Sequence, residues 1–230
     1  MAVACTVQGS LGFGSALLAA PLLALIHPAF VPGPILAANV LLTLLVARRE
    51  WSAIDFAGLK FIIVGRVVGN AVAAAMLIQL SQVFFDGLFG ALVLAAVGLS
   101  FARPSAGRSP RVLAAAGFAS GIMGTLSSIG GPPVALVYPH DDPARFRATL
   151  SAHFIFGGSL SLFAVWIVGR YGATELALTG LLLPAALAGF WLSRFGIQRI
   201  GTARLRSAVL ALSTMAGVGV LLRAISTHGS

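Results

Sequence analysis

Apolar residues fill eight long blocks of the sequence, and short clusters of turn-forming and charged residues separate them. A helix that crosses a bilayer needs about 20 consecutive apolar residues, so blocks of this length predict helices that span or enter a membrane. The blocks cover approximately residues 2–26, 32–47, 56–79, 83–102, 111–138, 146–169, 175–193 and 205–223. Because no separator is longer than a loop, we expect residues 1–230 to form a single membrane transporter domain without a soluble part.

The composition excludes the common soluble classes of protein. Hydrophobic residues make up 58% of the chain and charged residues only 9%, against about 25% charged residues in a typical soluble domain. So few charges cannot cover a soluble globule, which argues against a cytosolic enzyme, a secreted disulfide scaffold or a nucleic-acid binder. We expect a multi-pass integral protein of the bacterial inner (plasma) membrane, with the lipid bilayer as its surroundings and no nucleic-acid partner.

The sequence offers little for catalysis or for a metal. Cys5 is the single cysteine, and no cluster of Cys and His has the spacing of a metal site. Neither G-x-S-x-G nor H-E-x-x-H occurs in the chain. We therefore expect no enzyme, no cofactor and no metal.

The two halves of the sequence resemble each other. At an offset of 112 residues, Gly and Pro positions pair in order: Gly9 with Gly121, Gly12 with Gly124, Ser15 with Ser127, Pro21 with Pro133 and Asn39 with Ser151. At an offset of 120 the pairs continue: Trp51 with Tyr171, Asp55 with Glu175, Gly69 with Gly189 and Leu80 with Ile200. This pattern predicts an internal duplication, with repeats at about 1–102 and 111–225.

The basic residues indicate how the two halves lie in the membrane. If all eight blocks cross, and Arg66 inside a block is set aside, the basic residues divide eight to six between the two sides. If the first block of each half enters and turns back, the division is twelve to two, with only Arg170 and Arg223 outside. Because cytoplasmic loops are rich in Lys and Arg, the second arrangement is favoured. The expected fold is an all-α polytopic membrane protein of two homologous, inverted halves, each with a broken first helix and three transmembrane helices; eight full spans are the alternative.

Two blocks contain residues that interrupt a helix. Block 111–138 carries a run of Gly, Ser and Pro between Gly121 and Pro133, and block 2–26 carries a similar run between Gly9 and Ser15. We expect both to form a helix, a break and a second helix. Broken backbone at membrane depth is tolerated only where protein or a water-filled cavity covers it. Paired interruptions in two halves are the best sequence-level indication of a transporter's binding site.

At these residues the chain resembles the sulfite exporter TauE/SafE family of membrane transporters, also described as anion permeases. The resemblance covers nearly the whole length, through Gly9–Gly14 with Pro21, through Gly117–Gly124 with Ile129–Pro133, and through Trp51–Phe56. The first cluster has fewer glycines than the family pattern, and the N-terminal part is shorter than usual. The resemblance implies export or import of small sulfur-containing or carboxylate anions and leaves the substrate open.

The candidate substrate-binding residues are polar or small and lie inside the apolar blocks. They are Gly12, Gly14, Ser15, Asn39, Arg66, Asn70, Gly124, Ser127, Ser128, Gly130, Gly131, Pro132 and His153. Gly130–Pro133 fit the start of a half-helix whose unpaired N–H groups face an anion. Each candidate also has a structural interpretation: glycines allow close helix packing, and His153 can make a structural hydrogen bond.

Arg66 is the strongest single candidate. It lies ten residues into its block, where a charge is costly and is by default a functional hypothesis. Arg66 could supply the counter-charge of an anion, with Asn70 one turn later as an orienting donor; snorkelling to the headgroups is the structural alternative.

All acidic residues fall near block ends, so the expected function is movement of small anions without a buried carboxylate for Na⁺. A homodimer is compatible with this organisation. A non-transporting membrane assembly subunit is the alternative function.

Overall fold

The computed structural model describes residues 1–11, 14–102, 109–138, 143–195 and 202–226. This part of the chain consists of helices and connecting segments and contains no strand. The α-helices are α1 Ala2–Leu11, α2 Ser15–Ile26, α3 Gly33–Glu50, α4 Phe56–Gln79, α5 Gln82–Phe101, α6 Pro110–Ser127, α7 Gly131–Ala135, α8 Pro143–Ile167, α9 Ala173–Phe195 and α10 Thr202–Ser226. Two short 3₁₀ helices, η1 Pro28–Phe30 and η2 Trp51–Ala53, flank α3.

Six segments of the described chain are long and apolar enough to cross a membrane. They are Pro28–Leu45, Phe56–Gln79, Gln82–Phe101, Ala144–Ile167, Ala173–Leu192 and Ser207–Ser226. α2 is apolar but shorter, with 12 residues. The expectation of an all-α polytopic membrane protein is therefore confirmed, and the six candidate spans of the described chain agree with the favoured arrangement of three spans in each half.

Residues of distant segments meet at the two ends of the bundle. At one end, which we call the Asp55 end, the backbone N–H of Asp55 donates to Thr149 Oγ1 over 3.0 Å, and Tyr138 Oη donates to the Asp55 carboxylate over 3.3 Å. The start of α4, the end of the α7 segment and the start of α8 therefore lie together. At the other end, the Arg170 end, Arg170 donates to Leu80 O over 2.9 Å and to Gln82 Oε1 over 3.2 Å.

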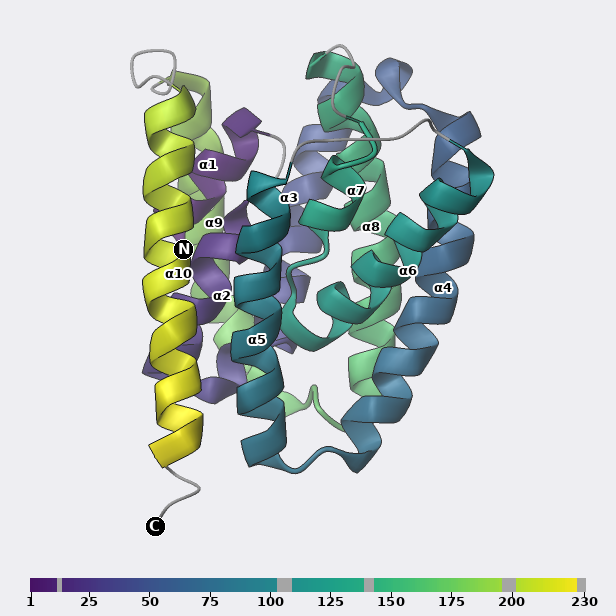
Figure 1. Ribbon diagram of the computed structural model, residues 1–230. Helices are drawn as coiled ribbons and strands as arrows, with labels where there is room; N and C mark the ends of the chain where they lie inside the picture. Colours follow the sequence, from purple (N-terminus) through teal and green to yellow (C-terminus); the bar gives the residue numbers. More distant parts are fainter. Residues whose placement is uncertain (12–13, 103–108, 139–142, 196–201, 227–230) are drawn as a thin grey trace.

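The helices of the two halves run in opposite directions between these ends (Figure 1). α3 and α5 run from the Arg170 end to the Asp55 end, and α4 runs back between them. α8 and α10 run from the Asp55 end to the Arg170 end, and α9 runs back between them. The helix directions thus agree with the expected fold, in which the three spans of one half are inverted relative to the three spans of the other.

α6 and α7 enter the bundle and return without crossing it. The backbones of α4 and α6 lie parallel and in contact, since a Cβ at Gly65 would lie 1.9 Å from Ala114 O and a Cβ at Gly69 would lie 2.2 Å from Phe118 O. α6 therefore starts at the Asp55 end, as α4 does, and Tyr138 after α7 is back at that same end. Glycine is needed at both α4 positions because any side chain would displace the α6 backbone.

The same packing recurs between the first broken hairpin and a span of the second half. α1 lies against α9, where a Cβ at Gly189 would lie 2.3 Å from Ala2 O, and Thr6 Oγ1 donates to Gly189 O over 3.2 Å. The repeat offset pairs Gly69 with Gly189, and each of these glycines allows the backbone of a neighbouring helix to approach closely. α2 then runs beside α10, to which it is joined by the bond from Ser213 Oγ to Leu17 O.

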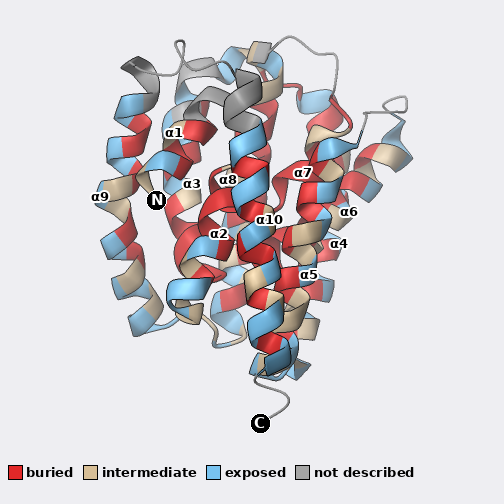
Figure 2. Ribbon diagram, turned by 60° about the vertical axis from the view of Figure 1, so that its left-hand side comes forward, coloured by how far each residue is buried: buried red, intermediate tan, exposed pale blue. Residues whose placement is uncertain are grey.

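The outer helices present apolar residues to their surroundings, while the polar residues are inside. Large side chains such as Val67, Leu181 and Met215 are 48%, 68% and 72% exposed. Figure 2 shows this alternation of exposed and buried residues along α9 and α10. In a bilayer these faces contact lipid, and the interior of the bundle holds the candidate site.

Candidate functional site

Arg66 is buried near the middle of α4, with 2% of its surface exposed. It is eleven residues beyond Asp55, which corresponds to about 16 Å along the helix axis. Its Nη1 donates to Ser120 Oγ over 2.6 Å and to His153 Nε2 over 2.7 Å, and its Nη2 donates to Ser161 Oγ over 3.3 Å. The guanidinium therefore points into the protein, and the snorkelling alternative is not what the structure shows.

Three glycines make the space that the guanidinium occupies. A Cβ at Gly157 would lie 1.9 Å from Arg66 Nε, one at Gly124 would lie 2.6 Å from Nη2, and one at Gly130 would lie 2.7 Å from Nη1. These glycines come from α8, from α6 and from the break before α7. Elements of the second half thus enclose a charge that the first half supplies.

The hydrogen-bond partners of Arg66 are all neutral. Ser120 Oγ accepts from Arg66 and donates to Gly130 O, and its Oγ is 2.9 Å from His153 Nε2. Arg66 Nε and His153 Nδ1 are buried and have no hydrogen-bond partner in the described part of the chain. Since buried polar atoms are nearly always paired, this is a place with unused donor capacity beside a positive charge.

Asn70 lies one turn beyond Arg66 and is also buried, at 2% exposure. The Asn70 amide makes the most hydrogen bonds in the orientation in which its oxygen accepts from Ser161 N over 3.0 Å and its nitrogen donates to Arg66 O over 3.1 Å. Thr125 Oγ1 donates to Ser161 Oγ over 3.0 Å. This network fixes α4, α6 and α8 behind Arg66, so Asn70 positions the helices and does not face the cavity described next.

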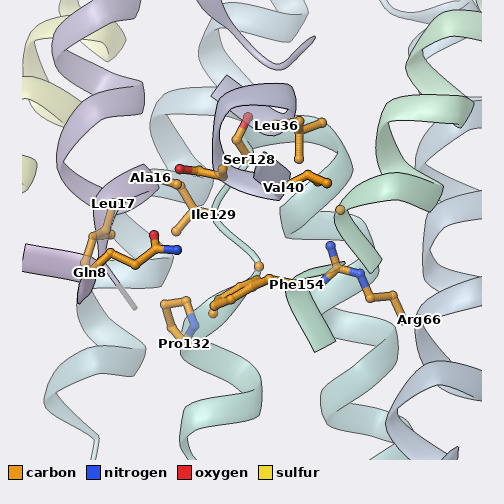
Figure 3. Close-up of a pocket in the computed structure, with 15 residues that line it drawn as sticks. Gln8, Ala16, Leu17, Leu36, Val40, Arg66, Ser128, Ile129, Pro132 and Phe154 are labelled. Carbon is orange, nitrogen blue, oxygen red and sulfur yellow. The ribbon is translucent and has the colours of Figure 1, made fainter. Parts of the chain in front are cut away.

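A cavity of about 30 Å³ lies between the two broken hairpins (Figure 3). Arg66 and Phe154 reach it from one side, and Gln8 and Leu17 reach it from the other. Ser128, Gly130, Gly131 and Pro132 of the second break line it, together with Gly14 and Asn39 of the first half. This volume suits a small number of water molecules.

The break between α1 and α2 contributes a polar wall. Gly14 has φ of +112°, which suits a residue without a side chain. Ser15 Oγ contacts both Gln8 Oε1 and Asn39 Oδ1, the latter over 2.8 Å. Ser15 therefore joins α1 to α3 behind the cavity surface, whereas Gly14 and Asn39 line it. Gly12, the remaining candidate of this break, lies outside the described residues.

The break between α6 and α7 forms where the sequence predicts it. Ser128 ends α6 with φ of +64°, and its Oγ donates to Pro32 O over 2.9 Å, which joins the break to the start of α3. Ser127 Oγ donates to Met123 O over 2.6 Å and accepts from Ile129 N over 3.3 Å. The Ser127 hydroxyl is thus hydrogen-bonded to the backbone of neighbouring residues, and Ser128 is the serine that reaches the cavity.

α7 is shorter than a half-helix that could hold an anion at its start. It spans five residues, Gly131–Ala135, with Pro132 in its first turn as expected. So few aligned peptide groups make only a small dipole. Arg66 is therefore the main positive group at the cavity, and the Gly130–Pro132 backbone shapes the wall beside it.

Asp55 is at the start of α4 and is already paired there. Its carboxylate accepts from Gly58 N over 3.1 Å and lies 3.4 Å from Arg145 Nη2. Burial by itself raises the pKa of Asp55, but the Gly58 hydrogen bond, the Arg145 charge and the Tyr138 hydroxyl together hold that pKa below its ordinary value. Asp55 is thus committed to the junction of α4 and α8, about 16 Å from Arg66.

Several residues of this site are not among the candidates that the sequence pattern predicts. Ser120, Ser161 and Gly157 contact Arg66, and Gln8, Phe154 and Gly158 line the cavity. A signal existed in α8, because His153, Gly157 and Ser161 recur every four residues and so share one helix face. Ser120 gave no such signal, since serine is common in membrane helices.

Comparison with known proteins gives one match. A family model described as Sulfite exporter TauE/SafE matches residues 1–220 of the 230-residue chain. The curated proteins and the solved structures give no match.

Proposed function

The chain belongs to the sulfite exporter TauE/SafE family of membrane transporters, and we propose that it carries small anions through the cavity between its two broken hairpins. The proposed substrates are sulfite, organosulfonates and related sulfur-containing or carboxylate anions. The proposed binding groups are the guanidinium of Arg66 and the cavity walls at Gly14, Asn39 and Ser128–Pro132, with His153 beside Arg66. The bacterial inner membrane is the proposed location.

The observation that supports this proposal is the unbalanced charge of Arg66. A buried cation is costly unless it is paired, and the groups around the guanidinium in the described part of the chain are neutral. An anion in the adjacent cavity would supply the missing negative charge. A packing role alone would not need a charge at this depth.

The chemistry of the guanidinium suits oxyanions. Its planar N–H groups can donate two parallel hydrogen bonds to two oxygens of one sulfite, sulfonate or carboxylate group. Nε has no partner, and Nη2 has one. A chloride ion would use this fork less well, because it has a single centre and no second oxygen.

Flux of radiolabelled sulfite or of a sulfonate into liposomes that contain the purified protein tests the proposal. Arg66→Gln removes one charge-assisted contact, worth about 1.5–3 kcal/mol, so the anion affinity should fall roughly ten- to 150-fold. Arg66→Lys keeps the charge without the planar fork and should be intermediate. Lys60→Gln is the matched control, because Lys60 is an exposed cation on the same helix.

The outcomes separate the alternatives. Flux that is unchanged in both Arg66 variants, with normal insertion, would place the anion elsewhere. No flux of any sulfur-containing or carboxylate anion in the parent protein would favour the non-transporting assembly subunit.

A further inference from the structure

His153 and Arg66 contact each other through nitrogen atoms, and this contact fixes the state of the histidine. Arg66 Nη1 is 2.7 Å from His153 Nε2. A guanidinium has no acceptor, so Nε2 must be the acceptor and must be unprotonated. In this arrangement, His153 is therefore a neutral imidazole with its proton on Nδ1.

A proton on Nε2 would disrupt that contact. It would direct an N–H of a cationic ring at an N–H of the guanidinium, and two like charges would lie within 2.7 Å in a buried place. His153 has 0% of its surface exposed, so water would not screen the repulsion. Protonation of His153 thus requires either that Arg66 turns away or that a negative charge joins the pair.

Ser120 offers an acceptor for the protonated ring. Its Oγ lies 2.9 Å from His153 Nε2 and donates its own hydrogen to Gly130 O. Because the serine hydrogen is already committed to Gly130, its lone pairs can accept from an Nε2–H. The same histidine nitrogen therefore has one partner for each protonation state: Arg66 when it accepts, and Ser120 when it donates.

We propose that His153 is a proton-binding site whose occupancy is coupled to anion binding at Arg66. This inference rests on the proposed function. An anion in the cavity competes with His153 Nε2 for the Arg66 donors and supplies negative charge. His153 then takes one proton from water at Nε2, donates it in a hydrogen bond to Ser120 Oγ, and returns it to water when the anion leaves.

The charge balance of the cavity indicates which anions should bind most favourably together with a proton on His153. With a monovalent anion and one proton, the net charge of the cavity stays at that of Arg66 alone. With a divalent oxyanion, the two cations Arg66 and protonated His153 neutralise the ligand completely. Because net charge is costly at membrane depth, the pair is suited to divalent oxyanions such as sulfite.

Other titratable groups near His153 are engaged elsewhere. Arg66 faces it from α4, while α6 and the α7 break present Ser120 and Gly130. Tyr138 and Asp55 lie at the Asp55 end and bond to each other, and Arg145 on α8 pairs with Asp55. In the described part of α3, the residues with ionisable side chains lie at the C-terminal end of the helix, near Arg48.

Calorimetric titration with sulfate tests the coupling, since this divalent oxyanion keeps its charge between about pH 5 and pH 8, where histidine titrates. The parent protein should take up close to one proton for each anion bound, as measured in buffers of different ionisation enthalpy. Its affinity should fall about five- to 150-fold across that range as pH rises, the usual size of a coupling between two sites. His153→Gln should bind the anion through Arg66 without proton uptake and with a flat pH dependence.

His27→Gln is the matched control, because His27 is an exposed histidine that caps η1. It should keep the proton uptake of the parent. Proton uptake that survives in His153→Gln, or anion binding by the parent without proton uptake, would overturn the proton site and leave the proposed function standing. Failure of the parent to bind any anion would overturn both.

A second measurement does not depend on any variant. In liposomes with a clamped membrane potential, an inward sulfate gradient should carry protons inward and acidify the lumen, which an enclosed pH dye reports. Anion influx without a change of internal pH would contradict the coupling.

Discussion

Gly157 on α8 and Arg66 on α4 are so close that a side chain at position 157 and the guanidinium would occupy the same space. A Cβ at Gly157 would lie 1.9 Å from Arg66 Nε, 2.3 Å from Cδ and 2.5 Å from Cζ. The absence of a side chain at one helix position in the second half thus determines where the buried charge of the first half can lie. The orientation of Arg66 toward Ser120 and His153 depends on this contact.

Replacement of Gly157 by alanine should therefore displace Arg66 and impair anion binding. The new methyl group has no room beside Nε, so the guanidinium must leave its partners. We expect the anion affinity in a binding or flux assay to fall by at least about tenfold, the effect of one lost charge-assisted contact of about 1.5 kcal/mol. Gly180→Ala is the matched control, since a Cβ at Gly180 meets no atom within 4 Å. Parent-like affinity in Gly157→Ala would show that the position of Arg66 is unimportant.

The contact between α4 and α6 should be equally sensitive to an added side chain, and here the effect should be on the stability of the folded protein. A Cβ at Gly65 would lie 1.9 Å from the backbone oxygen of Ala114 and 2.9 Å from Phe118 N. Because backbone atoms cannot move as the end of a side chain can, Gly65→Ala should destabilise the protein by about 1–3 kcal/mol. Thermal unfolding in detergent measures this, with Gly87→Ala as the control in open space. An unchanged unfolding temperature for Gly65→Ala would mean that α4 and α6 are not in close contact.

Asp55 should make the stability of the Asp55 end depend on pH. Its pKa in the folded protein is held below its ordinary value of about 3.9. A carboxylate with a depressed folded pKa contributes stability above its unfolded pKa, and this contribution is lost as the pH falls through the folded pKa. The parent should therefore lose unfolding temperature as the pH is lowered below about 4.

Asp55→Asn separates this charge effect from helix capping, because asparagine is also a good N-cap. The variant should unfold at a lower temperature than the parent near neutral pH, and the difference should shrink in acid. A difference that stays constant as the pH falls would show that the carboxylate charge is not involved.

The inverted arrangement predicts which positions share a side of the membrane. Arg111 lies in the first turn of α6 and Arg145 in the first turn of α8, both at the Asp55 end, and Arg170 is at the other end. With Cys5 replaced, cysteines at 111 and 145 should react with an impermeant thiol reagent from the same side, and a cysteine at 170 from the opposite side. The excess of basic residues predicts that the side of 111 and 145 faces the cytoplasm. Labelling of 111 and 145 from opposite sides would contradict the re-entrant hairpin.

The pattern of apolar blocks and breaks was sufficient to predict the architecture. Apolar length decides which segments enter a bilayer, and Gly and Pro decide where a helix within it must stop. For that reason, the break at Ser128–Gly130 and the matched packing of Gly69 and Gly189 are visible in the linear order of residues. The charge division correctly favoured six spans with inverted halves over eight, because charged side chains resist transfer through lipid.

The partners of the buried polar groups were decided only by the tertiary structure. Arg66 and His153 are 87 residues apart, and Ser120 and Gly157 complete their surroundings from two further turns of helix. The sequence requires that a guanidinium at this depth find partners, since a bare charge is too costly there. It does not say which helix supplies them, because helix periodicity describes one helix at a time, whereas contact between helices depends on how the inverted halves pack.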